Sequence, residues 1–239
     1  MSRPPKPAPL RVLRLITAHR RSAASDRTLA TILAGIAGAA NAGGFILLGS
    51  YTSHMTGYLS ALADNLVLQN LALVGQSLLA ISLFITGAAA SAATINWARA
   101  HQPTRQYSLP IGAQGVMLAG LAGLGAAHLP APFGHATGLG LLCFIMGFQN
   151  ATITKISNAR IRTTHATGMI TDVGIELGRE FFGRAFSHPV QADRVKLGIL
   201  TQLLGTFLLG GLIGAIGYGM VGFAFSLPLA AVLLAIALL

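Results

Sequence analysis

Long apolar stretches, separated by short polar connections, make up most of the chain after its first 27 residues. A helix of about 20 apolar residues crosses the hydrocarbon core of a bilayer, which is about 30 Å thick. Stretches of that length occur at residues 28–50, 72–98, 109–128, 136–156, 195–216 and 218–238. The pattern therefore predicts an all-α, polytopic membrane protein with six transmembrane helices.

Composition and charge agree with this prediction and give it an orientation. The chain is 53% hydrophobic and only 9% charged, whereas a soluble domain carries about a quarter charged residues. All sixteen Lys and Arg residues lie in the tail, residues 1–27, or in and beside the second and fourth connections. By the positive-inside rule, these segments and both termini are cytoplasmic. Because the membrane accounts for the net charge of +10, we expect no nucleic-acid partner.

A short motif occurs twice in the chain. Residues 53–57 (Ser-His-Met-Thr-Gly) and residues 164–168 (Thr-His-Ala-Thr-Gly) each follow one predicted span and lead into another. Residues 28–128 and 136–238 then form two modules of three spans each. Because three is an odd number, the second module is inverted in the membrane relative to the first. The prediction is two inverted three-helix repeats, preceded by a basic cytoplasmic tail that is partly disordered.

The Thr-Gly pairs suit the tip of an interrupted or short helix inside the membrane. A threonine hydroxyl can cap a helix N-terminus, and glycine tolerates the backbone geometry of a break. The freed amides and the positive helix end attract anionic or dipolar ligands. The alternative is that both segments are interfacial helices with ordinary Ser or Thr caps and no pore.

Polar residues near the two tips define a candidate substrate site. Each preceding span carries amide side chains, and the His and Thr of each motif follow. These features favour a small transporter or channel that binds a small polar or anionic solute between the tips. The predicted site residues are Asn41, His54, Thr56, Gly57, Gln149, Asn150, His165, Thr167, Gly168 and Asp172.

Two acidic residues, Asp172 and Glu176, lie four apart and therefore share one face of a helix. With Arg179 or Arg160 they form either a structural ion-pair network or a proton relay. We interpret the two motif histidines as making capping or pore-lining hydrogen bonds, because two histidines without a third ligand are a weak metal signal. We predict no metal site and no cofactor.

The sequence carries no motif of a known enzyme class. It has no nucleophile elbow, Walker-type loop, dinucleotide fingerprint or metalloprotease helix. Its one cysteine, Cys143, cannot form a disulfide framework or a paired-thiol metal site within the chain. We therefore expect that the protein is not an enzyme. A competing hypothesis, an intramembrane enzyme that uses His165 and Asp172, requires a substrate pocket that joins them.

Two pairs of motifs carry a family resemblance. Residues 38–49 are followed by His-Met-Thr-Gly at 54–57, and Met-Gly-Phe-Gln-Asn at 146–150 is followed by Thr-Thr-His-Ala-Thr-Gly at 163–168. In these motifs the chain resembles the YoaK family of bacterial integral membrane proteins, which is defined by a domain of unknown function. The resemblance covers roughly residues 28–238. It implies a multi-pass protein of the bacterial inner (plasma) membrane, without an established substrate.

The chain departs from that family at two positions. The family usually has Asp-Ala where this chain has Asn41 and Ala42, and Thr-Gly-Asn where this chain has Tyr58 after Thr-Gly. An asparagine keeps hydrogen bonding but cannot titrate. A proton-coupling role of a carboxylate in the first span, if the family has one, does not carry over to this chain.

A second functional hypothesis does not involve transport. In it the protein is a membrane scaffold or sensor, and the basic tail and fourth connection recruit anionic lipid headgroups or a partner protein. The expected partners are thus the lipid bilayer, anionic headgroups at the tail and a small solute, with a homo-oligomer compatible with either hypothesis. A sealed structure without a polar cavity near the midplane would favour the scaffold.

Overall fold

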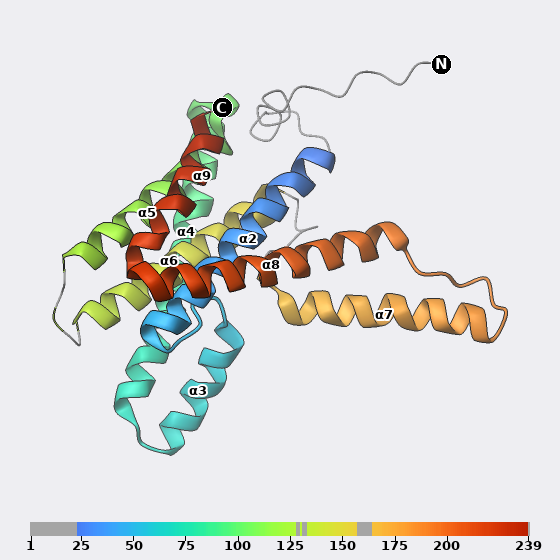
Figure 1. Ribbon diagram of the computed structural model, residues 1–239, viewed down its shortest axis with the longest axis horizontal. Helices are drawn as coiled ribbons and strands as arrows, with labels where there is room; N and C mark the ends of the chain where they lie inside the picture. Colours follow the sequence, from blue (N-terminus) through green and yellow to red (C-terminus); the bar gives the residue numbers. More distant parts are fainter. Residues whose placement is uncertain (1–22, 128–129, 131–132, 157–163, 239) are drawn as a thin grey trace.

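The computed structural model describes residues 23–127, 130, 133–156 and 164–238, and nearly all of these residues are helical. Figure 1 shows a bundle of long helices from which two helical hairpins project in different directions. Residues 1–22 of the tail that was predicted to be partly disordered lie outside the described residues. Arg160, a predicted ion-pair partner, is also outside them.

The chain order of helices is the same in both halves of the protein. In each half a long helix is followed by a motif helix, a second long helix and a final helix. The first half contains α2 (Ala23–Leu48), α3 (Met55–Val67), α4 (Leu71–His101), the 3-10 turn η1 (Pro103–Arg105) and α5 (Ser108–Ala126). The second half contains α6 (Phe133–Ile156), α7 (Ala166–Ala185), α8 (Arg194–Val221), the 3-10 turn η2 (Gly222–Phe225) and α9 (Ser226–Leu238).

Five helical segments of the described chain are long and apolar enough to cross a membrane, so the count of six is not confirmed. The first four agree with the predicted spans within a few residues. They are Ser25–Leu48, Leu71–His101, Ser108–Ala126 and Phe133–Ile156. The fifth, Arg194–Leu238, covers both of the last two predicted spans. Since α9 alone has 13 residues, it is too short to count as a separate span.

The break inside this fifth segment lies at Gly222. Its φ is +61°, which glycine adopts without the steric cost that a side chain would bring. The sequence pattern had placed the break near Gly217 instead. There, a side chain would collide with the ring of Phe225, so Gly217 serves packing while Gly222 ends α8.

Close glycine contacts join the long helices in pairs. Where α2 crosses α8, a Cβ on Gly38 would collide with the Phe207 carbonyl, and one on Gly210 with the Gly35 carbonyl. Where α4 crosses α6, a Cβ on Gly147 would collide with the Phe84 carbonyl, and a Cβ on Gly87 would collide with the Phe144 carbonyl. In a bilayer, packing at such short range is what holds helices together.

Helices α2 and α6 form the centre of the bundle. In their most apolar windows 56% and 67% of the residues are buried, whereas the figure is 22% for α4 and for the α8–α9 segment. Helix α5 packs beside α9 and also touches α6. The two central helices are also those that lead into the two motifs, so the motif segments start from the most constrained part of the fold.

The two projecting hairpins are built alike. Helix α3 packs on α4, and α7 packs on α8; Figure 1 shows each pair extending away from the bundle. Along the chain, the part of α4 and of α8 that belongs to the hairpin comes first, and the glycine crossing comes after it. Each motif therefore lies at the base of a hairpin, where hairpin and bundle meet.

Candidate functional site

The two motifs start helices in the same way. His54 is the N-cap of α3 and His165 is the N-cap of α7, with similar backbone angles (φ −93°, ψ 66° and φ −81°, ψ 52°). Neither histidine side chain makes a capping hydrogen bond. Of the two predicted uses of the histidines, capping hydrogen bonds are therefore wrong, while a pore-lining role stays a prediction. Thr56 and Thr167 are the second residues of their helices and so do not occupy the N-cap position.

The glycine of the first motif makes room for its histidine. A Cβ added to Gly57 would overlap the imidazole ring of His54. In the second motif, a Cβ on Gly168 would lie 3.5 Å from Nδ1 of His165, which is ordinary contact. In the first copy, the observed position of the His ring thus requires a glycine three residues later. In the second copy, an alanine would also fit.

An asparagine from the preceding helix holds each motif in place. Oδ1 of Asn41 accepts hydrogen bonds from the backbone N–H of Thr52 (3.0 Å) and of Ser53 (3.1 Å), and from the Ser53 hydroxyl (3.1 Å). Oδ1 of Asn150 accepts one from the Thr164 hydroxyl (2.6 Å). Ser53 and Thr164 are the first residues of the two motifs, so the two asparagines have matching roles.

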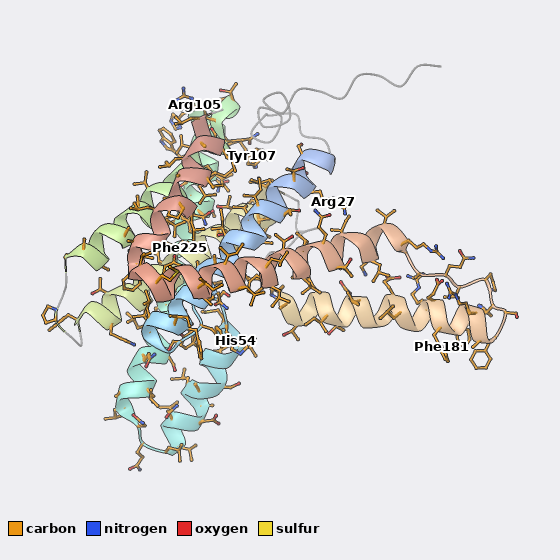
Figure 2. The ribbon with its side chains drawn as sticks, in the orientation of Figure 1. Arg27, His54, Arg105, Tyr107, Phe181 and Phe225 are labelled. Atoms are coloured by element: carbon orange, nitrogen blue, oxygen red, sulfur yellow. The ribbon has the colours of Figure 1, made fainter. Side chains whose placement is uncertain are left out.

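Both motifs open into one cavity of about 510 Å³. The cavity lies between α3, α4, α6 and α7. Figure 2 shows His54 beneath the bundle, where α3 begins, and Phe181 at the far end of α7. Predicted site residues in the lining are His54, Thr56, Asn150, His165 and Thr167. The other lining residues are Ser53, Met55, Phe84, Ala88, Ala151, Thr154, Lys155, Thr164 and Ala166.

The cavity walls are largely apolar but carry several polar side chains and one cation. His54, Thr56, His165 and Thr167 are exposed, and their side chains are available to a ligand. Lys155 is the charged residue of the lining, and none of the described lining residues is acidic. Such a set of donors suits an anion or a polar solute better than a cation. Among the described residues, no three His, Cys, Asp or Glu are grouped to hold a metal ion.

Lys155 is the main site residue that the sequence pattern did not identify. Its charge was assigned to membrane orientation, as were the other basic residues of its connection. Its position on α6, five residues after Asn150, was no signal, because only residues three or four apart lie on the same face of a helix.

Gln149 lies behind the cavity and ties three helices together. It is fully buried, and its Nε2 donates to the Leu33 carbonyl (2.7 Å). The Gln114 Nε2 donates in turn to the Gln149 Oε1. These bonds link α6 to α2 and to α5. A buried amide so engaged is a structural crosslink, and Gln149 is not among the residues that line the cavity.

Asp172 also lies outside the cavity, in the α7–α8 hairpin. Its carboxylate is 3.5 Å from Nζ of Lys196, which is itself 3.4 Å from Oε1 of Glu176. Glu176 is also 3.3 Å from Arg179. Of the two predicted uses of this face, the ion-pair network is present, and Arg179 is in it. Lys196 was not expected, because it comes from the next helix.

Among the acidic side chains that form the ion pairs of the hairpin, that of Glu176 is the most buried. It is buried and accepts a hydrogen bond from the backbone N–H of Asp193 (2.9 Å). That bond, followed by the charges of Arg179 and Lys196, holds the pKa of Glu176 below its usual value against the opposing effect of burial. The carboxylate is thus a charged anchor between α7 and the start of α8.

Asn41, Gly57 and Gly168 complete the predicted set. They do not line the cavity, but Asn41 holds the first motif and the glycines lie beside the motif histidines. The structure therefore gathers half of the predicted residues around one cavity and places Asn41 and the glycines directly behind it.

Comparison with known proteins identifies one family. The model of the family DUF1275, described as a protein of unknown function, matches residues 29–239. No curated protein and no solved structure matches the chain.

Proposed function

The chain belongs to the DUF1275 family, whose function is unknown, and we propose that it is a small transporter or channel for a small polar or anionic solute. The observation that carries the proposal is that both motifs, far apart in sequence, line one cavity and place their His and Thr side chains in it, near Lys155. Its apolar helices indicate an integral membrane protein. We place it in the bacterial inner membrane with both termini in the cytoplasm, as its distribution of basic residues favours.

The helix pairing supports two inverted repeats. If α2–α5 corresponds to α6–α9, the α2–α8 contact corresponds to the α6–α4 contact, and the α5–α9 contact corresponds to itself. The hairpin α3–α4 corresponds to α7–α8. The three most extensive helix contacts and the two hairpins thus match in the way that a twofold axis between the halves would produce, whereas the α5–α6 contact has no α9–α2 counterpart of similar extent.

The position of the cavity along α4 supports a site inside the membrane. Phe84 and Ala88 line the cavity, and they precede Arg99 on the same helix. At 1.5 Å per residue, they lie about 16 to 22 Å from Arg99 along the helix axis. The middle of a hydrocarbon core of about 30 Å is about 15 Å from its surface, so these residues lie between the midplane and the far half of the core. Lys155, at the end of α6, places the other end of the cavity near the basic surface.

Flux measurements in proteoliposomes test the proposal. The probes are chloride, acetate, phosphate and glycerol, followed by light scattering as the liposomes swell. We expect Thr56→Val and Thr167→Val each to reduce the flux of the permeant probe at least tenfold, since each removes a cavity hydroxyl. Thr171→Val is the matched control, because the Thr171 hydroxyl donates to its own helix at the Thr167 carbonyl and does not line the cavity.

Two results would contradict the proposal. Unchanged flux in both cavity variants would remove the site assignment. No flux of any probe through the unaltered, folded protein would favour the scaffold or sensor. In that case the projecting α3–α4 and α7–α8 hairpins would be the surfaces to test for partners.

A further inference from the structure

A second cavity, of about 770 Å³, lies between α5 and α9 and shares no lining residue with the central cavity. One end is polar and contains Thr104, Arg105 and Ser108. From there the cavity continues as an apolar groove along one face of α5, past Leu109 to Val116. Ser108 and Val116 are eight residues apart, so this part of the groove is about 12 Å long.

The floor of the groove is made by small residues. Gly112 and Ala113 of α5 lie opposite Ala237 of α9. A Cβ on Gly112 would be 3.2 Å from the Cβ of Ala237, so the two helices approach closely there. The walls carry exposed apolar side chains, with Val116 62% and Leu238 87% exposed. The groove is thus narrow, apolar and open to the surroundings of the bundle.

The polar end lies where the membrane surface is expected. Ser108 is the first residue of the candidate span Ser108–Ala126, and Arg105 precedes it by three residues, at headgroup level. Figure 2 shows Arg105 at the end of the bundle where α9 also ends. In the part of the chain that the structure describes, no carboxylate forms an ion pair with the Arg105 guanidinium.

We propose that this groove binds one anionic glycerophospholipid from the adjacent leaflet. The guanidinium of Arg105 binds the phosphate, with the Thr104 hydroxyl as a second donor, and an acyl chain lies along Gly112 and Ala113. Guanidinium and phosphate match in charge and in geometry, and basic pockets between membrane helices are sites for acidic headgroups. The chemistry is complementary at both ends: a free anion would leave the apolar groove unused.

Native mass spectrometry of the purified full-length protein tests this proposal. The detergent-solubilised protein is mixed with equal amounts of phosphatidylglycerol and phosphatidylcholine, and lipid adducts are counted. We expect one retained phosphatidylglycerol, preferred several-fold over phosphatidylcholine. Arg105→Gln should abolish the preference, and Ala113→Leu should displace the lipid by filling the groove. Arg99→Lys and Arg99→Gln are the matched controls, because Arg99 is an exposed arginine near the same surface that does not line the groove. Its Nε donates to the Gln106 Oε1 (3.2 Å), so the lysine variant, which keeps the charge, separates the loss of that contact from the loss of charge.

Three outcomes would overturn the proposal. The first is an unchanged preference in Arg105→Gln while size-exclusion chromatography shows an intact fold. The second is an equal loss in Arg99→Gln, which would mean a diffuse surface-charge effect. The third is a dimer that Ala113→Leu converts to a monomer, which would make a second copy of the chain the occupant.

Discussion

At the scale of single residues, the repeated motif places a histidine at the N-cap of a helix and a glycine beside its ring. In the first copy the His54 ring occupies the space that a side chain at position 57 would need. An asparagine from the helix before it fixes the segment through its carbonyl oxygen. The threonines are left free of capping, with their side chains toward the cavity. The geometry that the two copies share thus places the His and Thr of each motif at the cavity.

Alanine substitutions at the two motif glycines should have different effects. Gly57→Ala places a methyl group where the His54 ring lies, and because this ring is exposed it can rotate away at less than the cost of about 1 to 3 kcal/mol for overpacking a core. Gly168→Ala adds only an ordinary contact and improves helix propensity. We expect a lower thermal unfolding temperature for the first variant and no decrease for the second. The buried Cys143 can be followed with a thiol-reactive dye. Equal effects of both substitutions would contradict this account of the motif.

At the scale of helices and hairpins, glycine contacts hold the helix crossings together and ion pairs hold the α7–α8 hairpin together. Glycine contacts fix the crossings of α2 with α8 and of α4 with α6, deep in the bundle. Ion pairs fix the α7–α8 hairpin, where they join α7 to the first residues of the fifth candidate span. The described cations there, Arg179, Arg184, Arg194 and Lys196, are all paired with acids. This part of the basic connection is therefore internally balanced.

The α7–α8 hairpin should loosen in acid because of Glu176. The pKa of Glu176 is lowered in the folded protein, so its carboxylate contributes stability at neutral pH, and the contribution is lost as pH falls through that lowered pKa. We expect amide protection across residues 170–198 to be constant from neutral pH down to the usual glutamate range and to fall below it. The measurement is hydrogen–deuterium exchange, corrected for the intrinsic pH dependence of exchange.

Two variants show whether Glu176 is the cause. Glu176→Gln should already have reduced protection at pH 7, with a smaller further decrease in acid. Asp64→Asn, at an exposed position of the other hairpin, should behave like the unaltered protein. If Glu176→Gln retains full protection at neutral pH, the carboxylate is not the anchor of the hairpin.

At the scale of the whole molecule, the question is how the two halves are placed in the membrane. The halves have the same helix order and corresponding contacts. Two further pairs of positions agree with this: Phe84 and Gly87 correspond to Phe207 and Gly210 at the crossings, and Ser-Leu-Pro starts both α5 and α9. Neither pair was found from the motif alignment, because the connections between the matching segments differ in length.

Labelling from the two sides of the membrane tests the inverted arrangement. Cys143→Ala removes the native thiol, and Asp64→Cys and Arg184→Cys then place single thiols on the α3–α4 and α7–α8 hairpins. With a membrane-impermeant maleimide, we expect the first to react in one vesicle orientation and the second in the opposite one. Reaction of both from the same side would contradict inverted repeats.

The sequence alone determined the class of fold, most of the helix boundaries and the position of the motifs. Hydropathy, the spacing of basic residues and the His-x-Thr-Gly strings are local properties, and a bilayer makes apolar helices the required solution for them. The matching asparagines, Asn41 and Asn150, were also visible, since each precedes its motif by a similar distance.

Only the tertiary structure decided which side chains face the cavity and which helices pair. Gln149 and Asn150 are neighbours in sequence, yet successive positions of a helix point about 100° apart, so one ties the core together and the other lines the cavity. Asp172 forms an ion pair with Lys196 of the following helix. Helix α8 ends at Gly222, where φ is positive, and α9 follows. These outcomes depend on contacts between distant segments, which no local pattern contains.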